Sequence, residues 1–88
     1  MAKGNFRVAI GAHFKTVREL AGLSPEEVSA RAGGEISPSY IRRVERGLNS
    51  PTVDALVILC SAYNITIENF FTSLSLDEPK NGNGRKRA

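Results

Sequence analysis

Apolar residues recur at helical spacing along most of the chain, and this pattern predicts five helices joined by short polar turns. In the first, residues 6–21, an apolar side chain returns every three or four positions, as on the buried face of an amphipathic helix. That face consists of Phe6, Ile10, Phe14, Val17 and Ala21, with Leu20 beside it. Gly11 lies inside this helix, where glycine costs up to about 1 kcal/mol relative to alanine. We therefore expect another helix to approach closely at Gly11, and Gly22 to end the helix.

The second predicted helix begins at Ser24, which suits the N-cap position because its hydroxyl can accept a hydrogen bond from a free backbone N–H group. Pro25 suits the first helical position, and Glu27 completes a capping box. The helix ends at residues 33–34, two glycines that permit a sharp turn. Ile36 is the one apolar residue of that turn, and we expect it to be buried.

The third predicted helix has both ends marked, with Ser37 and Pro38 at its start and Gly47 at its stop. Its core-facing side comprises Ile41, Val44 and Leu48. The opposite side comprises Ser39, Arg43 and Arg46, with Arg42 at its margin. A short helix with arginines facing outward suits the DNA major groove, where arginine can bind guanine through two hydrogen bonds. A solvated basic face on an ordinary helix is the alternative.

Two more helices complete the pattern, the fourth beginning at Ser50-Pro51 and running to about Tyr63, and the fifth capped by Thr66. The buried stripe of the fourth contains Val53, Leu56, Leu59 or Cys60, and Tyr63. The fifth carries Ile67, Phe70, Phe71 and Leu74. Adjacent phenylalanines cannot point the same way on a helix, so one is expected in the core and the other outside. The outer ring would form an apolar patch with Leu74 and Leu76, unless the core absorbs both rings.

Composition limits the chain of 88 residues to a single domain, which we place at residues 1–76, followed by a disordered basic tail at 77–88. That tail could add nonspecific phosphate affinity or have no role. The domain carries 8 Lys/Arg against 7 Asp/Glu, so a DNA-binding face must arise from local clustering.

No apolar run is long enough to span a membrane and no signal peptide is present, which favours a cytoplasmic protein. Catalytic groups, a metal cluster and a cofactor motif are also missing from the sequence, so neither an enzyme nor a cofactor is expected.

These motifs, taken in order from about Ile10 to Phe71, resemble the Cro and phage-repressor class of helix-turn-helix regulators, the XRE family. The matching pieces are Ile10-Gly11, Val17-Arg18, Gly22-Leu23-Ser24, Glu26-Glu27-Val28, Ser39-Tyr40-Ile41, Glu45-Arg46-Gly47, Pro51-Thr52 and the segment from Leu59 to Ile67. The resemblance implies an all-α, five-helix, lambda-repressor-like DNA-binding domain. Its expected function is sequence-specific regulation of transcription, as a repressor or autoregulator that binds a palindromic operator on double-stranded DNA as a homodimer. A protein-interaction module with secondary DNA binding is the alternative.

The resemblance also implies roles for individual residues. Base edges would be faced by Pro38, Ser39, Arg42 and Arg43. Phosphates would be contacted by Ser24, Tyr40, Arg46 and Asn49. A buried ion pair would join Arg18 and Glu45. The apolar patch of the fifth helix is our candidate dimer surface, made of Phe70, Phe71, Leu74 and Leu76.

Three features depart from the family pattern. Pro25 stands where the family commonly has a glutamine that bonds a phosphate, so phosphate anchoring there must be weaker or come from neighbouring groups. The turn between Ser24 and Ser37 is two residues longer than usual, which can change the angle between the second and third helices. Pro38 has no side-chain donor or acceptor, so hydrogen bonding to bases is left to the other three residues.

Overall fold

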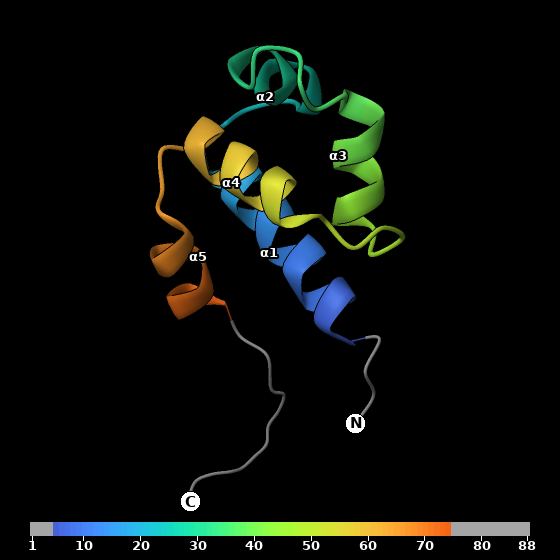
Figure 1. Cartoon of the computed structure of the whole chain (residues 1–88), viewed down its shortest axis with the longest axis vertical. Coiled ribbons are helices and arrows are strands. Elements are labelled where there is room, and N and C mark those ends of the chain that lie inside the picture. Colours follow the sequence, from blue (N-terminus) through green and yellow to red (C-terminus); the bar gives the residue numbers. More distant parts are fainter. Residues whose placement is uncertain (1–4, 75–88) are drawn as a thin grey trace, which may run out of the picture.

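The structure, a computed structural model, describes residues 5–74, which form five helices (Figure 1). They are α1 (Asn5–Leu20), α2 (Pro25–Arg31), α3 (Pro38–Glu45), α4 (Val53–Ala62) and α5 (Ile67–Ser73). No strand occurs within these residues, and the predicted all-α, five-helix class is confirmed. Leu76 and the predicted tail at residues 77–88 lie outside the described part of the chain.

The helix starts follow the capping residues. The hydroxyl of Ser24 accepts a hydrogen bond from the Glu27 N–H group (3.1 Å), and that of Ser37 accepts one from the Tyr40 N–H group (3.1 Å). Thr66 caps α5 as predicted. The predicted start of α4 is wrong by two residues, because Thr52 is the N-cap and takes the Ala55 N–H group at 3.0 Å. Local hydrogen bonding therefore determines four of the five helix starts.

α1 and α3 meet backbone to backbone at Gly11. A Cβ atom built on Gly11 would lie 2.0 Å from the carbonyl oxygen of Val44, far inside the contact distance. The close approach predicted at this glycine is confirmed. The contact leaves no space for a side chain on α1 at the crossing, and it holds α3 directly against α1.

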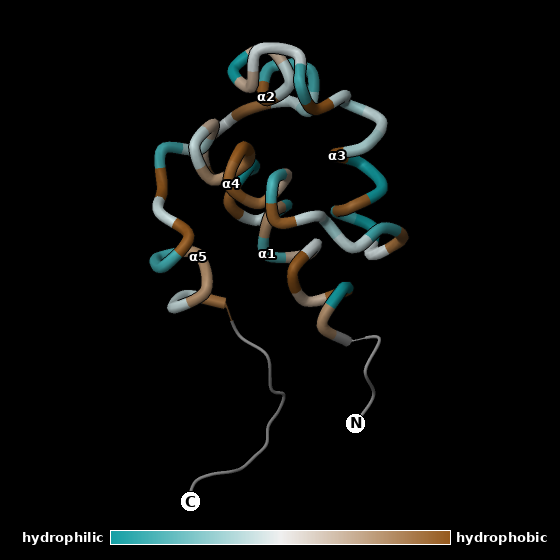
Figure 2. The backbone as a smooth tube through the Cα atoms, in the orientation of Figure 1, coloured by the Kyte–Doolittle hydropathy of each residue, from teal (hydrophilic) through white to brown (hydrophobic). Residues whose placement is uncertain are grey.

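The core lies between the helices and is built from all five. Along α3, hydrophobic and hydrophilic segments alternate (Figure 2). Its buried members are Phe14, Val28, Ile36, Ile41, Val44, Ala55, Leu59, Cys60, Ala62, Tyr63 and Phe70. Some predicted core positions are wrong, because these side chains are exposed: Phe6, Leu20, Ala21, Leu48 and Val53. Ala55 and Ala62 are buried on α4 instead.

α5 closes the core on the side of the molecule opposite α3 (Figure 1). The ring of Phe70 is 0% exposed and stacks on Phe14 with 4.2 Å between centroids. His13 Nε2 lies 3.0 Å from Ser73 Oγ, which joins α1 to the end of α5. Burial lowers the pKa of His13, so the neutral imidazole is favoured in this contact.

Candidate nucleic-acid interface

α3 presents a basic face to solvent because its apolar side is turned inward. Ile41 and Val44 are buried against the body of the domain. The exposed side chains of the helix and its C-cap include Ser39, Arg42, Arg43 and Arg46. Pro38 and Tyr40, also predicted to contact DNA, are half-buried. The helix lies at the edge of the molecule, where its outer face is uncovered by the rest of residues 5–74 (Figure 1).

The turn between α2 and α3 is held at both ends, although it is longer than the family pattern. Ile36 is buried, as predicted from its place in the turn. Ser29 on α2 donates a hydrogen bond from its hydroxyl to the Ile36 carbonyl oxygen (2.6 Å). Ser37 then caps α3. These contacts set the start of α3 relative to α2.

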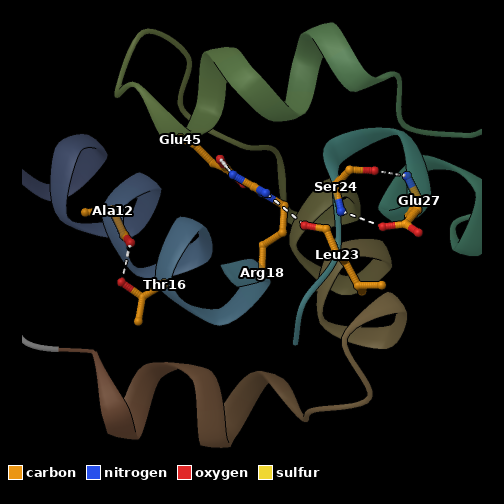
Figure 3. Close-up of polar contacts among 7 residues, drawn as sticks. All are labelled: Ala12, Thr16, Arg18, Leu23, Ser24, Glu27 and Glu45. Carbon is orange, nitrogen blue, oxygen red and sulfur yellow. Dashed lines mark hydrogen bonds and ion pairs between the residues drawn. The ribbon is translucent and has the colours of Figure 1, made fainter. Parts of the chain in front are cut away.

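Arg18 and Glu45 form a bidentate ion pair between α1 and the end of α3 (Figure 3). Arg18 Nε donates to Glu45 Oε2 at 2.8 Å, and Arg18 Nη2 donates to Glu45 Oε1 at 3.0 Å. The side chains are 14% and 6% exposed, respectively. Hydrogen bonding to Glu45 raises the pKa of Arg18. Arg18 Nη1 also donates to the Leu23 carbonyl oxygen (2.9 Å), so one guanidinium links α1, α3 and the loop before α2.

Basic side chains surround a hollow of about 310 Å³ between α1, the start of α2 and α3. Its lining residues are Lys15, Arg18, Pro25, Arg42, Glu45 and Arg46. The sequence predictions assigned no DNA contact to Lys15 or Arg18. The available signal was their spacing, because residues three apart share one face of a helix.

Arg42 is joined to α2 by an ion pair that the sequence analysis missed. Its Nη2 group donates to Glu26 Oε2, and the hydrogen bond lowers the pKa of Glu26. The two side chains are 44% and 59% exposed, so solvent screens this pair and it adds little to stability. In this pair the guanidinium of Arg42 lies toward α2.

The four residues predicted to contact phosphates differ in exposure and in how many hydrogen-bonding groups they have left for DNA. Both capping groups of Ser24 are engaged with Glu27, since the Ser24 N–H group donates to Glu27 Oε1 at 2.8 Å (Figure 3). Its hydroxyl hydrogen is left for another acceptor. Arg46 is exposed, whereas Tyr40 and Asn49 are half-buried.

The predicted dimer surface needs one correction. Phe70 is fully buried in the core and therefore offers no area to a partner. Phe71 is 42% exposed and Leu74 is half-buried. The remaining patch belongs to α5, and this helix lies on the opposite side of the domain from α3 (Figure 1).

Residues 5–74 contain no group of three His, Cys, Asp or Glu side chains placed to hold a metal ion. No single helix in this range is long and apolar enough to cross a membrane, and the bent pair of α4 and α5 that passes by composition turns through 92°.

Comparison with known proteins gives consistent relatives. A helix-turn-helix family model matches residues 14–70. The chain is 37% identical over 62 residues to the uncharacterized HTH-type transcriptional regulator y4dJ of Sinorhizobium fredii, covering 70% of this chain and 78% of the relative. It is 31% identical over 69 residues to the uncharacterized HTH-type transcriptional regulator Rv0474 of Mycobacterium tuberculosis, of which it spans 48%.

A solved structure shares the fold. The clp gene regulator ClgR from C. glutamicum superimposes with a TM-score of 0.67 at 24% identity, over 75% of this chain and 83% of that one. Together with the family match and the exposed basic helix α3, these relatives confirm the resemblance found in the sequence. The chain belongs to the XRE family of helix-turn-helix DNA-binding transcriptional regulators.

Proposed function

We propose that this protein is a sequence-specific regulator that binds double-stranded DNA by placing α3 in the major groove. The observation that carries the proposal is the outer face of α3, where exposed arginines stand over a buried aliphatic side. Arg43 and Ser39 project from the centre of this face and read base edges, Arg43 by two hydrogen bonds to guanine. Pro38 supplies an apolar contact to a thymine methyl group or a sugar.

Phosphate contacts on both sides of α3 hold the helix in its groove. Tyr40 lies in α3, Arg46 is its C-cap and Asn49 follows it. Ser24 is the N-cap of α2. Such contacts give affinity and register but no sequence information. Binding therefore has a general electrostatic part and a smaller, sequence-dependent part that rests on the outer face of α3.

The test is selection of bound sequences from a random pool of DNA duplexes. A single preferred sequence, bound more tightly than a scrambled duplex of the same length, supports the proposal. Equal binding to all duplexes would contradict it. The selected sequence also reveals whether the site is palindromic and how far apart its halves lie.

Arg43→Ala should weaken binding to the selected duplex by about 1–3 kcal/mol and relax the preference at one base pair. The reason is the loss of a bidentate guanine contact, which alanine cannot replace. Affinities measured on all four variants of each base pair give the result. An equal loss on every sequence would instead identify Arg43 as a phosphate contact.

The active form in this proposal is a homodimer on a palindromic site, with half-sites about 34–36 Å apart, one turn of the double helix. The exposed ring of Phe71 and the neighbouring Leu74 support a contact surface on α5. A dimer bound over a promoter would exclude RNA polymerase, which makes it a repressor, or an autoregulator if the promoter is its own.

Phe71→Asp should shift the protein toward the monomer, because a charge at the centre of an apolar contact is left without a partner. Light scattering over a concentration series measures the mass directly. Thr72→Asp is the matched control, since it adds the same charge at the next, also exposed, position of α5. An unchanged dimer mass for Phe71→Asp would remove this surface from the proposal and leave it as a site for another protein.

A further inference from the structure

The hollow beside α3 has the charge expected of a site for one phosphate group of the DNA backbone. Two helices supply its four basic side chains, Lys15 and Arg18 from α1, and Arg42 and Arg46 from α3 with its C-cap. Glu45 offsets one of these charges through its bidentate bond to Arg18. An excess of positive charge remains, facing a space of about 310 Å³ that is open to solvent.

Pro25 makes the basic side chains more important for binding an anion in the hollow. It lines the hollow at the start of α2 but has neither a side-chain donor nor a backbone N–H group. Pro25 itself therefore gives an anion in the hollow no hydrogen bond, and the basic side chains around it carry more of the binding. Lys15, Arg42 and Arg46 are the lining cations that make no ion pair with Glu45 among residues 5–74.

Arg42 and Arg43 point to different surroundings although they are adjacent. Arg42 lies four residues before Arg46, so the two share one side of the helix, and both line the hollow. Arg43 is exposed and is absent from the lining. α3 thus presents Arg43 to the groove and Arg42 to its flank. The hydrogen bond from Arg42 to Glu26 agrees with this placement, because it directs the guanidinium toward α2.

We infer that this hollow binds one phosphate of the DNA backbone through Lys15, Arg42 and Arg46, so that Arg42 contacts the backbone and not a base. The inference rests on the proposed function and departs from the role that family resemblance gives Arg42. Glu26 acts against binding in this arrangement. Its exposed carboxylate occupies one donor of the guanidinium, and a phosphate must compete with it for Arg42.

The first experiment measures the affinity of Arg42→Ala, Arg42→Lys and Lys15→Ala for the selected duplex and for a scrambled one, from 50 to 200 mM KCl. Loss of one phosphate contact should weaken both duplexes equally. It should also flatten the slope of log affinity against log salt by about 0.9, so that affinity falls about 3.5-fold less over this range. Arg42→Lys should keep the slope, because a phosphate needs only the charge. Arg31→Ala, which removes an exposed arginine that does not line the hollow, is the matched control.

Two results would overturn the inference. A loss confined to the selected duplex for both Arg42→Ala and Arg42→Lys, with a relaxed preference at one base pair, would make Arg42 a base contact. Unchanged affinity and slope on both duplexes would mean that Arg42 does not touch DNA. Circular dichroism melts of the variants establish that they remain folded, which is expected because Arg42 and Lys15 are exposed.

The second experiment locates the phosphate. Single phosphates of the selected duplex are replaced in turn by neutral methylphosphonates. The wild-type protein should lose affinity at one position in each half-site at which Arg42→Ala shows no further loss. An identical profile for both proteins would overturn the inference. If inorganic phosphate then still bound the protein in a titration, the hollow would be a site for free anions instead of the DNA backbone.

The third experiment tests the competition by Glu26. Glu26→Gln should tighten binding to both duplexes about equally, and the gain should disappear when Arg42 is alanine. Glu68→Gln on α5 removes the same charge far from α3 and controls for net charge. A gain that persists without Arg42, or no gain at all, would contradict the partner exchange.

These outcomes separate the inference from the proposed function. The function fails if the wild-type protein prefers no duplex over any other. In that case the salt series on the scrambled duplex still reports whether Arg42 and Lys15 contact phosphate.

Discussion

Glu45→Ala should lower the free energy of unfolding by about 3–5 kcal/mol, the usual cost of breaking a buried ion pair by removing one partner. The Arg18 side chain is 14% exposed in the intact pair, and the substitution removes its carboxylate partner and leaves it only the bond to the Leu23 carbonyl oxygen. A small domain has about 5–15 kcal/mol of stability in total, so the loss would be a large part of it. Urea denaturation followed by circular dichroism measures the change.

The control for Glu45→Ala removes both charges at once. The double variant Arg18→Met/Glu45→Leu leaves no unpaired ion, and apolar replacements of this kind are often neutral for stability or better. We expect it to unfold close to the wild type and well above Glu45→Ala. If Glu45→Ala itself had the wild-type midpoint, the pair would contribute nothing to the fold.

Phe70→Ala should cost about 3–5 kcal/mol, as for other fully buried aromatic rings truncated in a core. Phe70 is 0% exposed and is stacked on Phe14, with His13 4.8 Å away between ring centroids. Removing the ring leaves a cavity between α1 and α5. Chemical denaturation at a fixed temperature gives the difference in free energy.

Phe71→Ala is the matched control, since it removes the same ring from the next position of the same helix. Phe71 is 42% exposed and meets Phe70 edge to face at 5.2 Å, so its loss should cost much less. Equal losses of unfolding free energy in the two variants would contradict the burial of Phe70 and the exposure of Phe71 seen in the structure.

The fold was predictable where the signal is local. Ser24, Ser37 and Thr66 each bond an N–H group three residues ahead, so the helix starts can be found from a few consecutive letters. Gly11 could be interpreted because an unfavourable residue inside a helix needs a reason in the packing. These are properties of single turns of chain, and sequence alone contains them.

Packing between helices was not predictable to the same degree. Periodicity left Phe70 and Phe71 equivalent, and only contact with Phe14 selects Phe70 for the core. The same applies to α4, where Val53 fits the apolar period but lies outside the core while Ala55 lies within it. Which face of a short helix is buried depends on how closely its neighbours approach, and this is a tertiary property.

The candidate site divides in the same way. The outward placement of Arg43 follows from the helical period, whereas the pairing of Arg42 with Glu26 joins residues from two helices. Lys15 lies on α1, 27 positions before Arg42, and nothing in the sequence places them around one hollow. Resemblance to a family supplied roles for aligned positions, but it could not supply contacts particular to this chain.

The glycine contact between α1 and α3 has a consequence for how such a regulator can change its target. The backbones touch at Gly11 and Val44, on the inward side of α3, so this contact does not involve the outward side chains Ser39 and Arg43. Ser39 and Arg43 can therefore be exchanged for other residues without moving the scaffold that carries them. Single substitutions on the outer face of α3 can therefore change the preferred operator sequence while the arrangement of the helices stays the same.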